Sequence, residues 1–102
     1  MEFDKFSNSI TEELAVRIMV YEIREKNPAA VGFVVTPGDI KTILLYLKSK
    51  KYDTIMYLYG HPFLLEILKQ FEAVENYEVC EEIVKQITAH NNLFENNLKT
   101  KT

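Results

Sequence analysis

No glycine or proline follows Pro62, so no strong helix breaker interrupts the rest of the chain. Residues 62–91 can therefore form one long helix or a helical hairpin. In one unbroken helix, the apolar residues from Phe71 to Cys80 step by three, which rotates the apolar stripe away from a single face. A break at Asn76, capped by that residue, restores the stripe. We therefore favour two antiparallel helices, over residues 62–74 and 77–90.

A capping box predicts where the first helix begins. Ser9-Ile10-Thr11-Glu12 has the S-x-x-E pattern in which the two end residues satisfy each other's free amides. The helix should end at Asn27-Pro28, because the residue before a proline avoids the helical region. Apolar residues form two rows at helical spacing, so we expect a wide buried face and a central position in the bundle. The rows are Ile10, Leu14, Ile18 and Tyr21, and Val16, Val20 and Ile23.

The middle of the chain contains a connector and two further helices. Residues 28–35 have strand character, but no partner strand is visible, so we favour a helical turn and an extended connector near residues 31–36. Thr36-Pro37-Gly38-Asp39 predicts a helix start, with a cap, a proline at the first position and an acid at the third. A third helix fits Asp53 to Tyr59, with Asp53 as cap and Gly60 as left-handed terminator.

These elements predict an all-α protein, a compact bundle of four to five helices that ends in a helical hairpin. The length of 102 residues fits one domain. We assign residues 1–8 to an N-terminal arm, 9–91 to a single helical domain, and 92–102 to a frayed or flexible tail. The predicted core is Leu14, Ile18, Ile43, Leu47, Leu64, Ile67, Phe71 and Ile83.

Composition narrows the class of protein. No apolar run approaches the roughly 18–20 residues of a membrane span, and no secretory signal is visible at the N-terminus. The net charge of −3 argues against a nucleic-acid coat. Many Lys, Asn, Ile, Phe and Tyr residues indicate an AT-rich genome, such as that of a low-GC bacterium or its phage. We expect a cytoplasmic protein of the bacterial or host cell, or a virion component.

The residue types that carry catalysis are sparse. His61 and His90 are the only histidines, and neither has a second metal ligand at helical spacing. Cys80 is the only cysteine, and its glutamate neighbours disfavour the reactive thiolate, so we expect a core residue. The five glutamates between Glu72 and Glu82 are expected to form a solvated rim. We predict no enzymatic activity, no cofactor and no metal.

Residues 46–61 are the candidate interaction surface. Four of the six tyrosines lie there beside three lysines, and tyrosine is enriched at binding surfaces. The competing interpretation is a helix–helix corner with half-buried tyrosines. Because leucine and isoleucine already fill the core side, we expect at least two of these tyrosines to be exposed. The candidate protein-interaction residues are Tyr46, Lys48, Lys50, Lys51, Tyr52, Tyr57 and Tyr59.

The sequence predicts a small helical protein that acts through protein–protein contacts, with a protein partner or by self-association. The composition suits an accessory protein of a phage or mobile element, such as a virion component, an assembly factor or an inhibitor of a host system. The alternative is a small DNA-binding regulator of the helix-turn-helix type. Its second helix would be DTIMYLYG, which is too apolar to read a groove. We expect neither a nucleic-acid nor a membrane partner.

Overall fold

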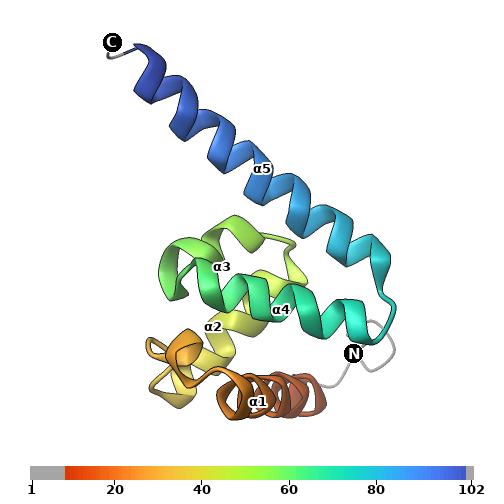
Figure 1. The fold of residues 1–102 in the computed structure, drawn as a ribbon. Helices are drawn as coiled ribbons and strands as arrows, with labels where there is room; N and C mark the ends of the chain where they lie inside the picture. The colour runs from red at the N-terminus through yellow and green to blue at the C-terminus, as the bar shows by residue number, and fades with distance from the viewer. Residues whose placement is uncertain (1–8, 101–102) are drawn as a thin grey trace.

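The computed structural model describes the backbone of residues 9–100 and the side chains of residues 11–91. It is an all-α bundle, as predicted (Figure 1). The predicted arm, residues 1–8, and the last two residues of the predicted tail lie outside the described residues. No helix in the described part of the chain is long and apolar enough to cross a membrane. In chain order the elements are α1 (Ser9–Lys26), the 3-10 helix η1 (Pro28–Val31), α2 (Pro37–Lys48), α3 (Tyr52–Tyr59), α4 (His61–Ala73) and α5 (Tyr77–Thr100).

The predicted hairpin is confirmed, because α4 and α5 are separate helices that contact each other. The side chain of Asn76 caps α5 by accepting a hydrogen bond from the Val79 amide. α5 continues to Thr100, beyond the predicted end at residue 90, and projects past the other helices (Figure 1). The flexibility assigned to residues 92–102 stays a prediction.

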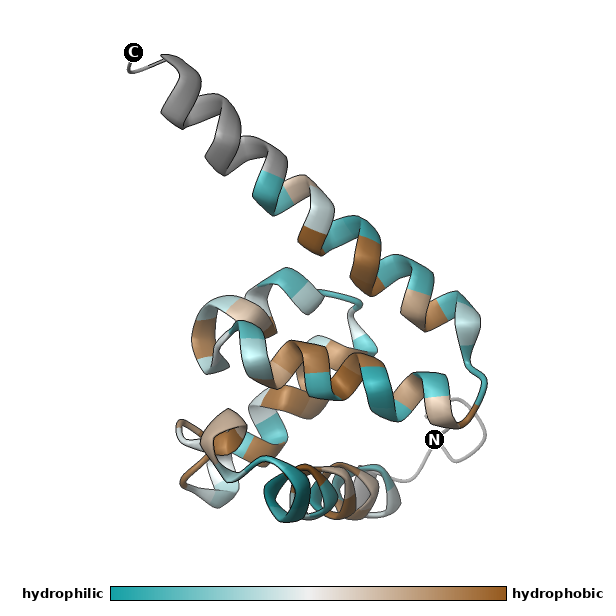
Figure 2. Cartoon of the chain, in the orientation of Figure 1, coloured by the Kyte–Doolittle hydropathy of each residue, from teal (hydrophilic) through white to brown (hydrophobic). Residues whose placement is uncertain are grey.

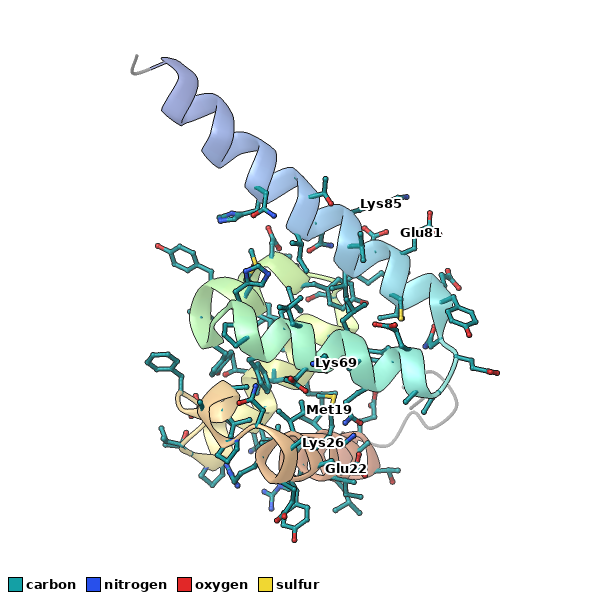
Figure 3. The ribbon with its side chains drawn as sticks, in the orientation of Figure 1. Met19, Glu22, Lys26, Lys69, Glu81 and Lys85 are labelled. Carbon is teal, nitrogen blue, oxygen red and sulfur yellow. The ribbon has the colours of Figure 1, made fainter. Side chains whose placement is uncertain are left out.

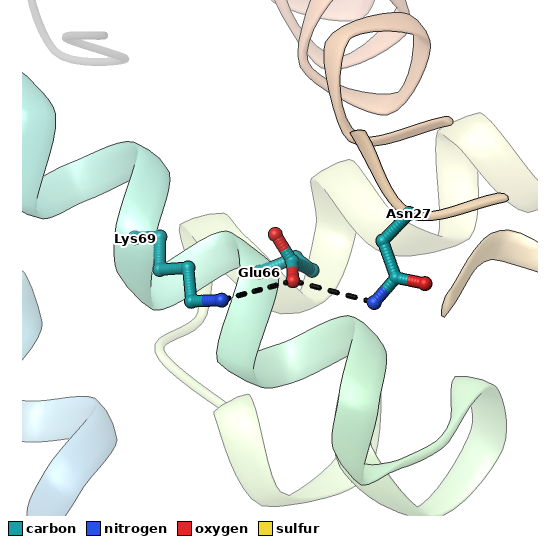
Figure 4. Close-up of polar contacts among 3 residues, drawn as sticks. All are labelled: Asn27, Glu66 and Lys69. Atoms are coloured by element: carbon teal, nitrogen blue, oxygen red, sulfur yellow. Dashed lines mark hydrogen bonds and ion pairs between the residues drawn. The ribbon is translucent and has the colours of Figure 1, made fainter. Parts of the chain in front are cut away.

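The central helix is α4, and the prediction that α1 holds this place is wrong. α4 contacts α1, η1, α3 and α5, and hydrophobic residues run along its length (Figure 2). Its buried arc includes the acid Glu66, which is stabilised by two donors. The Glu66 Oε2 atom accepts from Asn27 Nδ2 at 3.4 Å and pairs with Lys69 Nζ at 3.2 Å (Figure 4). The hydrogen bond from Asn27 connects the residue that follows α1 to α4.

Only one of the two apolar rows of α1 enters the core. Met19, which points toward α4 in Figure 3, is buried together with Val16, Val20 and Ile23. The prediction that Leu14 and Ile18 are core residues is wrong, since they are 55% and 50% exposed. Tyr21, in the same row, is 61% exposed, and the side chain of Ile10 lies outside the described residues. The cause is the peripheral position of α1, because a helix covered from one side can bury only one of two rows.

The other core predictions are confirmed. Ile43 and Leu47 on α2, three residues of α4 and Ile83 on α5 are buried together. The connector prediction also agrees with the structure, because η1 is followed by residues in irregular conformation and the described residues contain no strand. Within this connector Val31 and Val34 are buried, while Phe33 and Val35 face solvent.

Local capping chemistry fixes the start of α2 as predicted. The Thr36 hydroxyl accepts a hydrogen bond from the Asp39 amide at 3.3 Å. In return, the Asp39 carboxylate accepts from the Thr36 amide at 2.9 Å and from the Val35 amide at 3.0 Å. These backbone donors lower the pKa of the Asp39 carboxyl, because they stabilise its charged form.

Two helices end in the left-handed conformation without a glycine. Lys50 after α2 and Glu75 after α4 both have φ of 59°. After α2, the Lys51 amide donates to the Tyr46 carbonyl and the Lys50 amide to the Leu47 carbonyl, which is the Schellman pattern. The same pattern closes α4, where the Asn76 amide donates to the Phe71 carbonyl. Gly60 also has a positive φ, 100°, but its ψ of 151° places it outside the left-handed helical region that was predicted.

Leu47→Ala and Leu14→Ala form a matched pair that tests the assignment of the core. Leu47 is buried, so its truncation should lower the free energy of unfolding by about 2–5 kcal/mol. Leu14 is more than half exposed, so the same substitution should cost less than about 1 kcal/mol. Chemical denaturation at low protein concentration measures both, and equal losses would contradict the placement of α1.

Lys50→Gly and Glu75→Gly should each raise the free energy of unfolding by about 0.5–1 kcal/mol, because glycine adopts the left-handed conformation without a steric cost. Lys41→Gly is the control, since Lys41 lies inside α2 and glycine should cost about 1 kcal/mol there. Denaturant midpoints report all three variants. A loss of stability at position 50 or 75 would rule out the described helix ends.

Candidate functional site

The tyrosines of residues 46–61 do not form the exposed patch that the sequence predicted. Tyr52 and Tyr59 are buried, at 2% and 6% exposure, and Tyr46 is half-buried against the core. Only Tyr57 of the four is exposed, at 85%. The expectation of at least two exposed tyrosines is therefore wrong, because α3 packs against α2, α4 and α5 and buries Tyr52 and Tyr59 in the core.

Tyr59 joins the end of α3 to the start of α2. Its hydroxyl donates to Asp39 Oδ1 at 3.0 Å, and its ring meets Phe63 edge to face at 5.9 Å between centroids. Burial, followed by the contact with Asp39, raises the pKa of Tyr59 to about 12. Tyr59 is therefore a structural residue and not part of an accessible surface.

Tyr52 lies where α3 meets α5. Burial raises the pKa of its hydroxyl, and the negative charges of Glu82 and Glu78 on α5 raise it further. A cavity of about 160 Å³ at this contact is lined by the same three residues together with Lys50, Asn76 and Val79. Two of the predicted acidic rim residues thus lie beside a buried tyrosine.

The three lysines have different surroundings. Lys48 pairs with Glu12 at 3.1 Å, which ties the end of α2 to the start of α1. Glu12 is only 2% exposed, and its Oε2 atom has no hydrogen-bond partner among the described residues. The buried carboxylate is therefore stabilised by the contact of its Oε1 atom with Lys48. Lys50 occupies the left-handed position, and Lys51 is the exposed residue before α3.

The accessible feature of the predicted segment is a cleft between α3 and the middle of α5. Its volume is about 680 Å³, and Tyr57 forms part of its wall. Both histidines reach this cleft from separate helices, His61 at the start of α4 and His90 on α5, a proximity that no sequence spacing indicated. The lining residues are Asp53, Thr54, Met56, Tyr57, His61, His90 and Asn91.

Gln86 of α5 fixes the geometry at the start of α3. Its Oε1 atom accepts from the Asp53 amide at 2.8 Å, and its Nε2 atom donates to the Lys50 carbonyl at 2.8 Å. The side chain therefore caps α3 from another helix, whereas Lys51 makes no side-chain cap and the predicted cap Asp53 lies inside α3. Sequence reasoning missed Gln86, because its partners lie 33 and 36 residues away and no local pattern marks it.

The described residues contain no group of three or more His, Cys, Asp or Glu side chains arranged to hold a metal ion. Cys80 lies at a different cavity, beside Leu68 and Glu72, where it is buried and its thiol lies 3.9 Å from the Leu68 carbonyl. Burial, and then the charge of Glu72, raises the pKa of this thiol, which disfavours a thiolate nucleophile.

Comparison with known proteins adds no relative. No protein-family model matches the chain, and searches of curated proteins and of solved structures find no match.

Gln86→Ala should lower the free energy of unfolding by about 1–2 kcal/mol, because it removes the cap of α3 and the partner of the Lys50 carbonyl together. Gln86→Glu should cost less, since it keeps an acceptor for the Asp53 amide. Thr88→Ala, an exposed change on the same helix, is the control and should shift stability by less than about 0.5 kcal/mol. Denaturation curves in which Gln86→Ala matches the control would contradict the capping role.

Proposed function

We propose that this protein is a non-enzymatic binding module that docks a segment of another protein in the cleft between α3 and α5. The observation that carries the proposal is Tyr57, an 85% exposed aromatic side chain at the wall of a cleft of about 680 Å³. Tyrosines in such positions are frequent anchors of protein interfaces, because they bury a large area at a low cost in side-chain entropy.

The lining residues suggest what the partner segment carries. Met56 and Tyr57 offer contact area for an apolar side chain, and Asp53 at the rim offers an exposed carboxylate. Asp53 forms no ion pair with any described side chain, so a cation of the partner has an available counter-charge. A segment with an apolar anchor followed by lysine or arginine fits this arrangement.

The alternative of a DNA-binding regulator has less support. The exposed positions of α3 include Asp53, Tyr57 and Leu58 and no lysine or arginine. A carboxylate on the exposed face of a recognition helix repels the DNA phosphates, whereas proteins that recognise bases in a DNA groove place cationic side chains there. The composition that suits a phage or mobile-element accessory protein is compatible with the binding module and adds no specific partner.

A photo-crosslinking residue at position 57 tests the proposal, with position 77 as the matched control. Tyr77 is also an exposed tyrosine, but it lines the cavity beside Cys80 and not the cleft. In cells that produce the protein, the probe at position 57 should capture one protein that the probe at position 77 does not.

The captured partner then allows a binding measurement by calorimetry. Tyr57→Ala should weaken its affinity at least about tenfold, which corresponds to roughly 1.4 kcal/mol, because the aromatic anchor is lost. Tyr77→Ala should leave affinity within about twofold. Equal effects of the two variants, or capture of nucleic acid at position 57, would contradict the proposal.

A further inference from the structure

The outer face of α1 carries an apolar stripe that no described residue covers. Leu14, Ile18 and Tyr21 follow one another at i, i+4 and i+7, and each is at least half exposed. Single exposed apolar residues are ordinary on protein surfaces, but three large ones in line on one helix form a continuous patch. The opposite face of the same helix already packs into the core, so the patch faces outward from the bundle.

Charged residues border this stripe in a defined order. Arg17 lies on one side of it and Glu22 on the other, both exposed. Neither forms an ion pair with another described side chain, and Glu22 does not pair with Lys26 one turn further on (Figure 3). In heptad terms Ile18 and Tyr21 occupy the a and d positions, and Arg17 and Glu22 occupy g and the following e.

We propose that two copies of this chain associate through α1, with the two helices parallel and the stripes of Leu14, Ile18 and Tyr21 in contact. In a parallel pair, a g residue lies beside the e residue five positions later on the other helix. Arg17 of each copy then lies beside Glu22 of the other, which gives two symmetric ion pairs across a two-fold axis. A second copy therefore supplies both an apolar cover and the missing counter-charges.

The reverse orientation fits the charges poorly. In an antiparallel pair, g residues lie beside g residues, which brings Arg17 of one copy close to Arg24 of the other. Like charges at such positions oppose association. The order of charges along α1 thus selects the parallel arrangement.

The size of the stripe sets the expected strength of the dimer. α1 has 18 residues and is roughly 27 Å long. Glu25, in line with the stripe at its C-terminal end, limits close contact to the earlier turns. In a typical stable interface each partner buries about 800 Å². The stripe on α1 buries less than this, so we expect a dissociation constant on the order of 100 µM.

Sedimentation equilibrium of the full chain, from about 10 µM to about 1 mM, measures this association directly, because mass action makes it depend on concentration. The wild-type chain should pass from monomer to dimer across this range. Ile18→Glu should remain monomeric with an unchanged helical circular-dichroism signal, since Ile18 is half exposed. Tyr57→Ala should dimerise like the wild type, which separates this face from the cleft proposed above.

Charge reversal tests the orientation. Arg17→Glu and Glu22→Arg should each weaken the dimer at least about threefold, because each replaces attraction by repulsion. The double variant should recover wild-type association, and an equimolar mixture of the two single variants should form heterodimers. A chain that stays monomeric near 1 mM, or a dimer that survives Ile18→Glu, would overturn the proposal. A tighter dimer for Arg17→Glu would show the antiparallel pair and overturn the parallel one.

Discussion

The bundle depends on the wide buried arc of α4. Phe63, Leu64 and Ile67 are fully buried, so this helix serves at once as the wall for α1, α3 and α5. Such an arc leaves little room for polar residues, and the acid within it, Glu66, is accommodated by Asn27 and Lys69. α1 is covered mainly from one side, so its outer face stays accessible. α3 is covered by α2, α4 and α5, but the cleft between α3 and α5 stays accessible beside the exposed Tyr57.

The two proposed surfaces belong to different parts of the bundle. α1 and α5 lie on different sides of α4 in Figure 1. Association through α1 would therefore leave the cleft between α3 and α5 open in both copies. A dimer of this kind would present two equivalent clefts, and a partner with repeated segments would bind it more tightly than a single cleft, because the second contact is intramolecular. A weak dimer thereby becomes relevant to binding wherever the partner itself is repeated.

The sequence predicts the fold where the chemistry is local, and fails where the choice depends on distant residues. The capping box of Thr36 and Asp39 and the cap at Asn76 involve neighbours in the chain, so the ends that they mark agree with the structure. α1 carries two apolar rows, and helical periodicity does not decide which row meets α4. At the candidate site, the sequence predicts at least two exposed tyrosines, whereas Tyr57 alone of the four is exposed. The burial of Tyr52 and Tyr59 and the capping by Gln86 depend on α2, α4 and α5, whose residues lie far away in the sequence.

Gln86 also ties the local stability of α3 to that of α5. An eight-residue helix has little intrinsic stability in water, and α3 contains no side chain that caps its own start. If α5 lifts away, α3 loses its cap and the contact around Tyr52 in the same event. Gln86 and the contact around Tyr52 therefore couple the two walls of the cleft, and undocking of α5 would lower the local stability of α3 and raise the exchange of its amides with solvent.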